Sequence, residues 1–283
     1  MFIKVAVDEI EPTAMMCLRL ILAAAVLVPV LFVVVGAREA VAEMRATGWG
    51  SFVVGLLNMA LPFTLIAWGE KHIDSGIAAI ANASVPIFVA LLALRFNPGE
   101  RVSGLRLAGV LVGFAGVGVL AGLDPEGGWW AIAGTLAVVA ASLCYAGANH
   151  YVQHRFSRTS ALVIATASSV TGAVLLLPFA LFQLPAELPS WKALGSVAVL
   201  GILGTAVALL FFYRMLNRYG AARASLVTYL LPPTALVYGA LILDEAIRLN
   251  AILGLALILA GVALGSGVFR LARREAVPAT PRP

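Results

Sequence analysis

Long apolar runs separated by short polar segments dominate this chain. From Met15 onward, apolar stretches of about 20 residues recur, the length that an α-helix needs to cross a bilayer. The alternating segments of a membrane β-barrel do not occur. The pattern predicts an all-α polytopic membrane protein with spans near 13–36, 48–69, 75–96, 102–121, 129–151, 159–182, 191–213, 222–243 and 251–269, and residues 1–6 resemble the end of another span.

Composition agrees with this pattern and narrows the function. The 283 residues are 61% hydrophobic and 12% charged, with a mean hydropathy of +1.00. The net charge of +5 is explained by cations in the loops, so we expect no nucleic-acid partner. Cys17 and Cys144 lie inside apolar runs without metal-ligand spacing, and we expect no disulfide, metal or cofactor.

Part of the chain is repeated. The segment from Gly76 to Gly122 reappears near the C-terminus, with an offset of 146 at the proline and 145 at later positions. The matched pairs are Pro86 and Pro232, Glu100 and Glu245, Gly109 and Gly254, and Gly116 and Gly261. We therefore expect a first repeat at 1–123, a second repeat at 124–272 and a polar tail at 273–283.

The repeat also predicts the architecture. Pro29 matches Pro178, and the second copy has a full helix before that point where the first has almost none. We expect about ten transmembrane helices in two inverted five-helix repeats, with the first helix largely missing in this numbering. Inverted repeats allow one central site to open alternately to either side.

The charges of the loops predict the orientation. Fourteen of the 19 Lys and Arg residues lie on one side of the predicted spans, whereas Lys71, Lys192 and Arg248 lie on the other. By the positive-inside rule the first side, which includes the C-terminus, is cytoplasmic. The loop with Asp8, Glu9 and Glu11 then faces outward.

Prolines inside the spans mark candidate functional positions. A proline frees the carbonyl four residues earlier, and in a membrane that carbonyl needs a new partner. Four prolines have a polar residue at that earlier position: Asn58 before Pro62, Asn82 before Pro86, Thr228 before Pro232 and Tyr229 before Pro233. These positions predict a central polar cavity with hinges at the prolines. The alternative is that the prolines only kink the helices and that the polar side chains repair them locally.

Other polar residues share the predicted inner faces. The candidates for the lining of the cavity are Asn58, Trp68, His72, Asn82, Ser84, Tyr145, Asn149, Tyr213, Ser225, Thr228 and Tyr229. Competing interpretations remain open, because tryptophans at span ends often anchor the interface, buried tyrosines often bond a carbonyl, and His72 has charged neighbours typical of a solvated position.

Two cations, Lys4 and Arg19, fall inside predicted spans. They either reach the outer interface or pair with the acidic loop at Asp8, Glu9 and Glu11, or they form a gate or a contact for a carboxylate. All 14 carboxylates lie in loops, at span ends or in the tail, which favours facilitated or exchange transport over proton coupling.

The spans at 102–121 and 251–269 are rich in glycine. Gly109 and Gly113 have the spacing that brings helix backbones close, as do Gly261 and Gly265. This spacing predicts that the two helices serve for packing, either within the chain or between protomers. The sequence does not determine whether the protein is a monomer or a dimer.

The motifs of common enzymes do not occur. We find no nucleophile elbow, no HExxH and no P-loop. We therefore expect no catalytic residues and no enzymatic activity, although a membrane enzyme or binding protein without translocation is a competing interpretation.

The two copies carry a recognisable pattern. Each has a helix, a proline, a glutamate thirteen or fourteen residues later, and glycines at fixed spacing, and the chain opens with IKVAVDEIEPTAMMCLRLILAA. In these features the chain resembles the EamA branch of the drug/metabolite transporter superfamily, and it is similar to the YddG-type bacterial amino-acid exporters.

The resemblance implies export of amino acids, aromatic ones among them, across the bacterial inner membrane through a central cavity. The expected partners are a small-molecule substrate and the lipid bilayer. An exporter of drugs or other metabolites is the competing interpretation within the superfamily.

Overall fold

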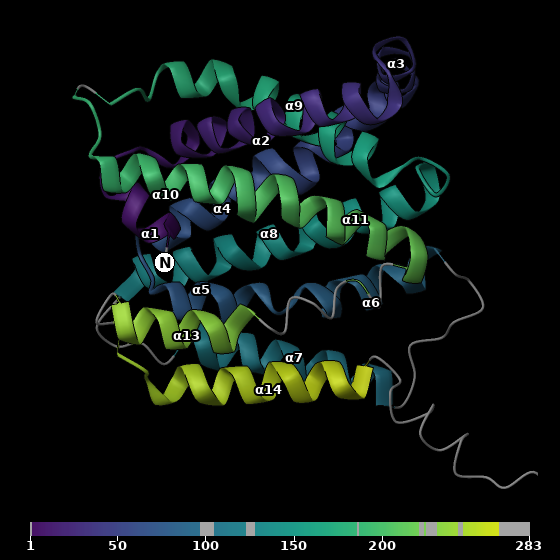
Figure 1. Ribbon diagram of the computed structural model, residues 1–283. Coiled ribbons are helices and arrows are strands. Elements are labelled where there is room, and N and C mark those ends of the chain that lie inside the picture. Colours follow the sequence, from purple (N-terminus) through teal and green to yellow (C-terminus); the bar gives the residue numbers. More distant parts are fainter. Residues whose placement is uncertain are drawn as a thin grey trace, which may run out of the picture.

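The computed structural model describes residues 2–96, 105–122, 128–185, 187–220, 224, 231–242 and 246–265, and every element in these ranges is a helix (Figure 1). Two π-helical segments, η1 (Gly55–Ala60) and η2 (Ile202–Val207), lie between α-helices. The α-helices are α1 (Phe2–Val7), α2 (Pro12–Val35), α3 (Ala37–Val54), α4 (Leu61–Glu70), α5 (Ser75–Asn82), α6 (Val85–Phe96), α7 (Leu105–Gly122), α8 (Gly128–Arg155), α9 (Ala161–Leu181), α10 (Trp191–Gly201), α11 (Ala208–Tyr219), α13 (Leu231–Ile242) and α14 (Leu249–Gly265).

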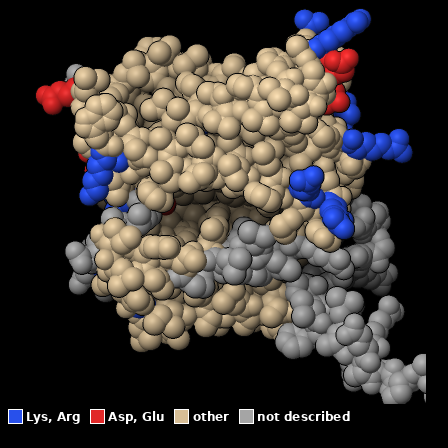
Figure 2. All heavy atoms as spheres, viewed as in Figure 1, with Lys and Arg blue, Asp and Glu red and all other residues tan. Residues whose placement is uncertain are grey.

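The helices are long enough for a membrane protein. Within the described ranges, six helical segments can cross a bilayer by length and composition: Pro12–Val35, Ala37–Glu70, Ser75–Leu92, Gly128–Arg155, Ala161–Leu181 and Trp191–Tyr219. Figure 2 shows charged side chains at the two ends of the helices with a wide uncharged band between them. These features agree with the predicted polytopic membrane protein, and the number of ten spans stays a prediction.

Several predicted spans are interrupted. The helix that contains the predicted span 48–69 begins at Ala37 and has non-helical torsion angles at Gly48, where φ is 50°. This positive φ favours glycine, which has no Cβ. The predicted span 75–96 is broken after Asn82, where α5 ends, and resumes at Val85.

Helices of the two copies pack on each other. α2 packs on its counterpart α9 and α7 on its counterpart α14, whereas α5 packs on α13, which is the counterpart of α6. Glycines make the α7–α14 contact possible, since a Cβ on Gly116 would lie 2.8 Å from the main-chain nitrogen of Ile258. A Cβ on Gly261 would lie 2.5 Å from the main-chain nitrogen of Gly113. The glycine-rich helices therefore pack within the chain, which decides between the two alternatives that the sequence left open.

Candidate functional site

Arg19 lies inside the helix bundle on α2 and is only 8% exposed. Its Nε–H donates to Thr205 Oγ1 at 2.7 Å, and Nη2 donates to the carbonyl oxygen of Gly204 at 3.3 Å. The guanidinium carbon lies 4.0 Å from the centroid of the Phe63 ring. Arg19 forms no ion pair with a carboxylate of the described residues.

This position corrects one of our two interpretations of Arg19. The side chain neither reaches the outer interface nor pairs with the acidic loop, because it is buried in the bundle, where two of its N–H groups bond η2. The alternative, a gate or a contact for a carboxylate, stays a prediction.

A second polar cluster joins the two copies. Asn58 in η1 donates from Nδ2 to the hydroxyl of Tyr213 on α11 at 2.9 Å. The same hydroxyl lies 3.3 Å from Oγ of Ser168 on α9. Tyr213 and Ser168 are fully buried, so this hydroxyl is shared between an amide and another hydroxyl away from solvent.

The two clusters occupy matching positions in the repeat. The π-helical segments begin at Gly55 and Ile202, 147 positions apart, and the same offset relates Asn58 to Thr205. The offset of 149 between Pro29 and Pro178 also relates Arg19 to Ser168. Arg19 of α2 bonds η2 of the other copy directly, whereas Ser168 of α9 is linked to Asn58 in η1 through the shared hydroxyl of Tyr213. Together, Arg19, Thr205, Asn58, Tyr213 and Ser168 are called the polar junction.

Sequence reasoning missed part of this junction. It did not predict either π-helical segment, and it passed over Ser168, which lies among Thr166, Ser169 and Thr171 in α9. The offset of the two leading prolines, applied to Arg19, would have found it.

The π-helical geometry also explains Pro62. The main-chain N–H of Leu61 bonds the carbonyl oxygen of Leu56, five residues back, and Pro62 then falls in the first turn of α4. A proline is tolerated there because the first N–H groups of a helix have no partner within it.

Asn82 lies at the break between α5 and α6. The Ser142 hydroxyl on α8 lies 3.3 Å from Asn82 Oδ1 and 3.5 Å from the carbonyl oxygen of Asn82. Ser84 donates to the carbonyl oxygen of Ala81 at 2.7 Å, and Pro86 occupies the first turn of α6. The break is therefore stabilised by Ser142 of α8, whereas the Ser84 hydroxyl bonds a carbonyl group three residues earlier, at the end of α5.

Trp68 and His72 form an aromatic cluster with Trp130 near the end of α4. The ring centroids of Trp68 and His72 lie 4.7 Å apart, and the His72 ring stacks on Trp130 at 5.1 Å. These contacts place His72 against two indoles, partly shielded from solvent.

Lys4 stabilises the end of α4. Its Nζ donates to the carbonyl oxygens of Glu70 at 2.8 Å and Ile73 at 3.1 Å. A cation next to the last carbonyl groups of a helix is favourable. Stabilisation of the end of α4 is therefore sufficient to explain a lysine at position 4.

The other candidates are placed less completely. Tyr145 and Asn149 both lie on α8, where Asn149 is buried and Tyr145 is partly buried. Ser225, Thr228 and Tyr229 lie outside the described residues, and Pro232 and Pro233 stand in the first turn of α13.

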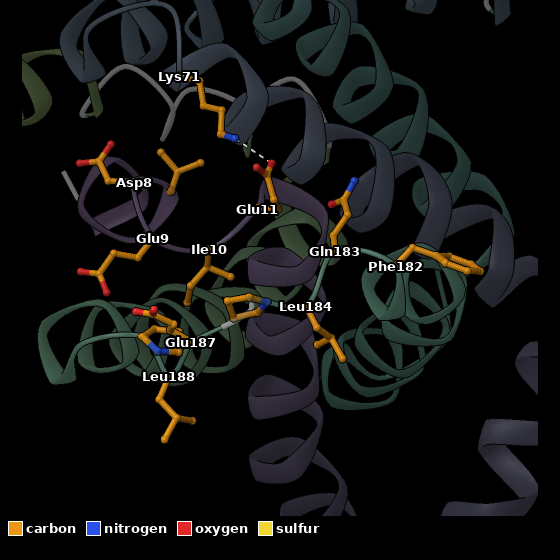
Figure 3. Close-up of a pocket in the computed structure, with 13 residues that line it drawn as sticks. Asp8, Glu9, Ile10, Glu11, Lys71, Phe182, Gln183, Leu184, Glu187 and Leu188 are labelled. Carbon is orange, nitrogen blue, oxygen red and sulfur yellow. Dashed lines mark hydrogen bonds and ion pairs between the residues drawn. The ribbon is translucent and has the colours of Figure 1, made fainter.

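A pocket of about 580 Å³ lies at one end of the bundle, between the α1–α2 loop and the α9–α10 loop (Figure 3). Lys71 and Glu11 form an ion pair of 2.7 Å at its edge. Glu9 accepts hydrogen bonds from the main-chain N–H and the hydroxyl of Ser190, at 2.6 and 2.7 Å. These two bonds lower the pKa of the Glu9 carboxyl below its ordinary value of 4.5. The sequence placed the acidic loop on the outer side but did not predict that it joins α10.

Comparison with known proteins supports a membrane transporter. The model of the EamA-like transporter family matches residues 1–122 and 132–267. The chain is 27% identical over 280 residues to the uncharacterized transporter YoaV of Bacillus subtilis, covering 96% of this chain and 92% of YoaV.

Two further relatives have names that state a substrate. A probable terminal-alkyne amino-acid exporter of Streptantibioticus cattleyicolor is 32% identical, covering 78% of this chain and 74% of that protein. A probable amino-acid metabolite efflux pump of Escherichia coli is 27% identical, covering 97% of this chain and 91% of that protein.

The fold has a solved counterpart. A crystal structure with 21% sequence identity superimposes with a TM-score of 0.67 and covers 96% of this chain and 92% of that chain.

Proposed function

The chain belongs to the EamA-like transporter family, and from this premise we propose that it is a secondary transporter that exports amino acids, aromatic and other neutral ones, or related small metabolites. In this proposal the protein crosses the bacterial inner membrane ten times in two inverted repeats and keeps its C-terminus in the cytoplasm. One central site opens alternately to the two sides. Two relatives named for amino-acid substrates support the choice of substrate.

The polar junction is the observation that carries the proposal. Polar and ionisable groups inside membrane helices cost free energy, and they are retained where they serve substrates or conformational change. Here Arg19 and Asn58 of the first copy bond Thr205 and Tyr213 of the second. In alternating access one repeat moves against the other, so hydrogen bonds between the two copies must break and form again during transport.

We assign the substrate site to the surroundings of this junction. Asn58, Asn82 and Tyr145 contribute groups that can hydrogen-bond or stack on a small molecule, with Thr228 and Tyr229 added from the sequence alone. Pro62 and Pro86 stand at helix interruptions, which suits them to act as hinges.

Flux through purified protein tests the proposal. Proteoliposomes preloaded with radiolabelled amino acids are expected to release them faster than protein-free liposomes, and unlabelled amino acids should compete. Release of drugs or other metabolites without release of amino acids would favour the other branch of the superfamily. No flux with any member of a broad panel would contradict transport and favour a membrane enzyme or binding protein.

The same assay measures coupling. An imposed pH gradient and an imposed membrane potential should change the initial rate little if the carrier works by facilitated or exchange transport. A strict requirement for a proton gradient would contradict this part of the proposal.

A further inference from the structure

The Arg19 guanidinium has more hydrogen-bonding capacity than its surroundings use. A guanidinium has five N–H groups. Two are used by Thr205 and Gly204, and a third points to the sulfur of Met16 at 3.8 Å, which is a weak acceptor. In the described part of the chain the remaining two meet no acceptor.

The charge of Arg19 is also incompletely balanced. Burying a cation is costly unless a carboxylate pairs with it, and Arg19 forms no ion pair within the described residues. Glu70 interacts with it electrostatically without forming such a pair. A buried, unpaired guanidinium therefore favours an anionic ligand.

The surroundings hold the guanidinium in a fixed orientation. Phe63 covers its face at 4.0 Å, and η2 binds one edge through Thr205 and Gly204. A guanidinium fixed in this way presents its other N–H groups in one plane, as bidentate binding of a carboxylate requires. The matching position of the second copy is the neutral Ser168, so the polar junction offers one cation and suits one carboxylate.

We infer that Arg19 binds the carboxylate of the transported molecule, so that the substrates are small molecules with one free carboxylate. The inference rests on the proposed function, because it names the group by which the transported molecule is recognised. The Thr205 hydroxyl acts as a positioning group that orients the guanidinium.

Substrate analogues test this inference in the wild-type protein. Proteoliposomes are first assayed with the common amino acids, and the best substrate is then compared with its amide and with the amine that lacks the carboxyl carbon. Loss of a buried charged partner predicts that both analogues compete at least about tenfold more weakly than the amino acid. Equal competition by the amide or the amine would overturn the inference while leaving transport intact. Absence of flux for every amino acid would instead contradict the proposed function and the inference with it.

Variants provide the second arm. R19Q is expected to lose the discrimination between acid and amide, R19K to retain part of it, and T205V to raise KM for the acid with a smaller effect on the rate at saturation. R38Q removes the same charge at an exposed position and should transport like the wild type. Thermal unfolding in detergent identifies variants that fail to fold, in which case the analogue comparison alone decides. Full discrimination in a folded R19Q would overturn the inference.

Discussion

The side-chain amide of Asn58 donates a hydrogen bond of 2.9 Å to the hydroxyl of Tyr213, and these two buried residues come from opposite copies of the repeat. The same hydroxyl lies 3.3 Å from Ser168. A single tyrosine hydroxyl therefore connects η1, α9 and α11, three elements that are distant in sequence.

Removing this hydroxyl should destabilise the protein. Tyr213→Phe leaves the Asn58 amide and the Ser168 hydroxyl buried without this partner, at a cost of about 1–3 kcal/mol. We expect a lower midpoint of thermal unfolding in detergent. Tyr219→Phe is the matched control, because Tyr219 is 48% exposed, and it should change the midpoint little. Equal midpoints for the two variants would show that the shared hydroxyl contributes nothing.

The contact between α7 and α14 gives a second prediction. In Gly116→Ala the new Cβ would lie 2.8 Å from the main-chain nitrogen of Ile258, so the helices must separate, at a cost of about 1–3 kcal/mol. The same substitution at Gly118 meets open space on the same helix. We expect Gly116→Ala to lower the midpoint of thermal unfolding and Gly118→Ala to leave it unchanged or raise it. The reverse order would contradict this packing.

The hydropathy of the chain predicts much of the helical framework. The predicted span 13–36 differs from α2 by one residue at each end, because apolar length and the flanking Pro12 and Gly36 are local signals. The kink at Gly48 and the two π-helical segments were not predicted. They depend on how each helix meets its neighbours, which local periodicity does not record.

The candidate site was predicted only in part. Asn58 and Tyr213 were chosen one by one, and the structure adds that they bond each other. For Arg19 the sequence left open the outer interface, the acidic loop, and a gate or a contact for a carboxylate, and it did not indicate that its partner Thr205 lies in the other copy. Contacts between the copies depend on tertiary packing, which local sequence patterns do not record. The offset between the repeats is the one sequence feature that relates the residues of the two copies.

The break between α5 and α6 gives a third prediction. Ser142→Ala removes the hydroxyl of α8 that lies near the Asn82 amide and the last carbonyl groups of α5. We expect slower amino-acid flux, and Asn82→Ala should act in the same direction with normal expression. Thr135→Val is the control, because the Thr135 hydroxyl bonds the Ala131 carbonyl of its own helix and keeps nothing else in place. Unchanged flux in Ser142→Ala and Asn82→Ala would remove this break from the site.

Two lysines near the end of α4 should differ in their effect on stability. Lys4 donates to two carbonyl oxygens in a partly buried setting, and hydrogen bonds from a charged group contribute about 1.5–3 kcal/mol. Lys71 pairs with Glu11 at a more exposed position, where an ion pair contributes about 0–1 kcal/mol. Lys4→Met should therefore lower the midpoint of thermal unfolding more than Lys71→Met. High salt should reduce the effect of Lys71→Met first, since exposed pairs are screened.

The bond between Glu9 and Ser190 predicts a dependence of stability on pH. Because the folded protein lowers the pKa of Glu9 below 4.5, its ionised form stabilises the fold at pH values above 4.5. This contribution falls as the pH drops through the lowered pKa, where the carboxylate becomes protonated. The midpoint of thermal unfolding of the wild type should thus exceed that of Glu9→Gln near neutral pH, and the difference should shrink in acid.

Ser190→Ala should lose most of the stability that ionised Glu9 contributes near neutral pH. The reason is that the hydrogen bond from the Ser190 hydroxyl is the main cause of the lowered pKa of Glu9. The variant also loses the hydroxyl that accepts from the Ala193 N–H at the start of α10, so its midpoint should fall at every pH. Glu187→Gln, in the wall of the same pocket, is the control and should follow the wild-type profile. A difference between wild type and Glu9→Gln that grows in acid would show that Glu9 does not act through this bond, since its sign would be opposite to that of a lowered carboxyl pKa.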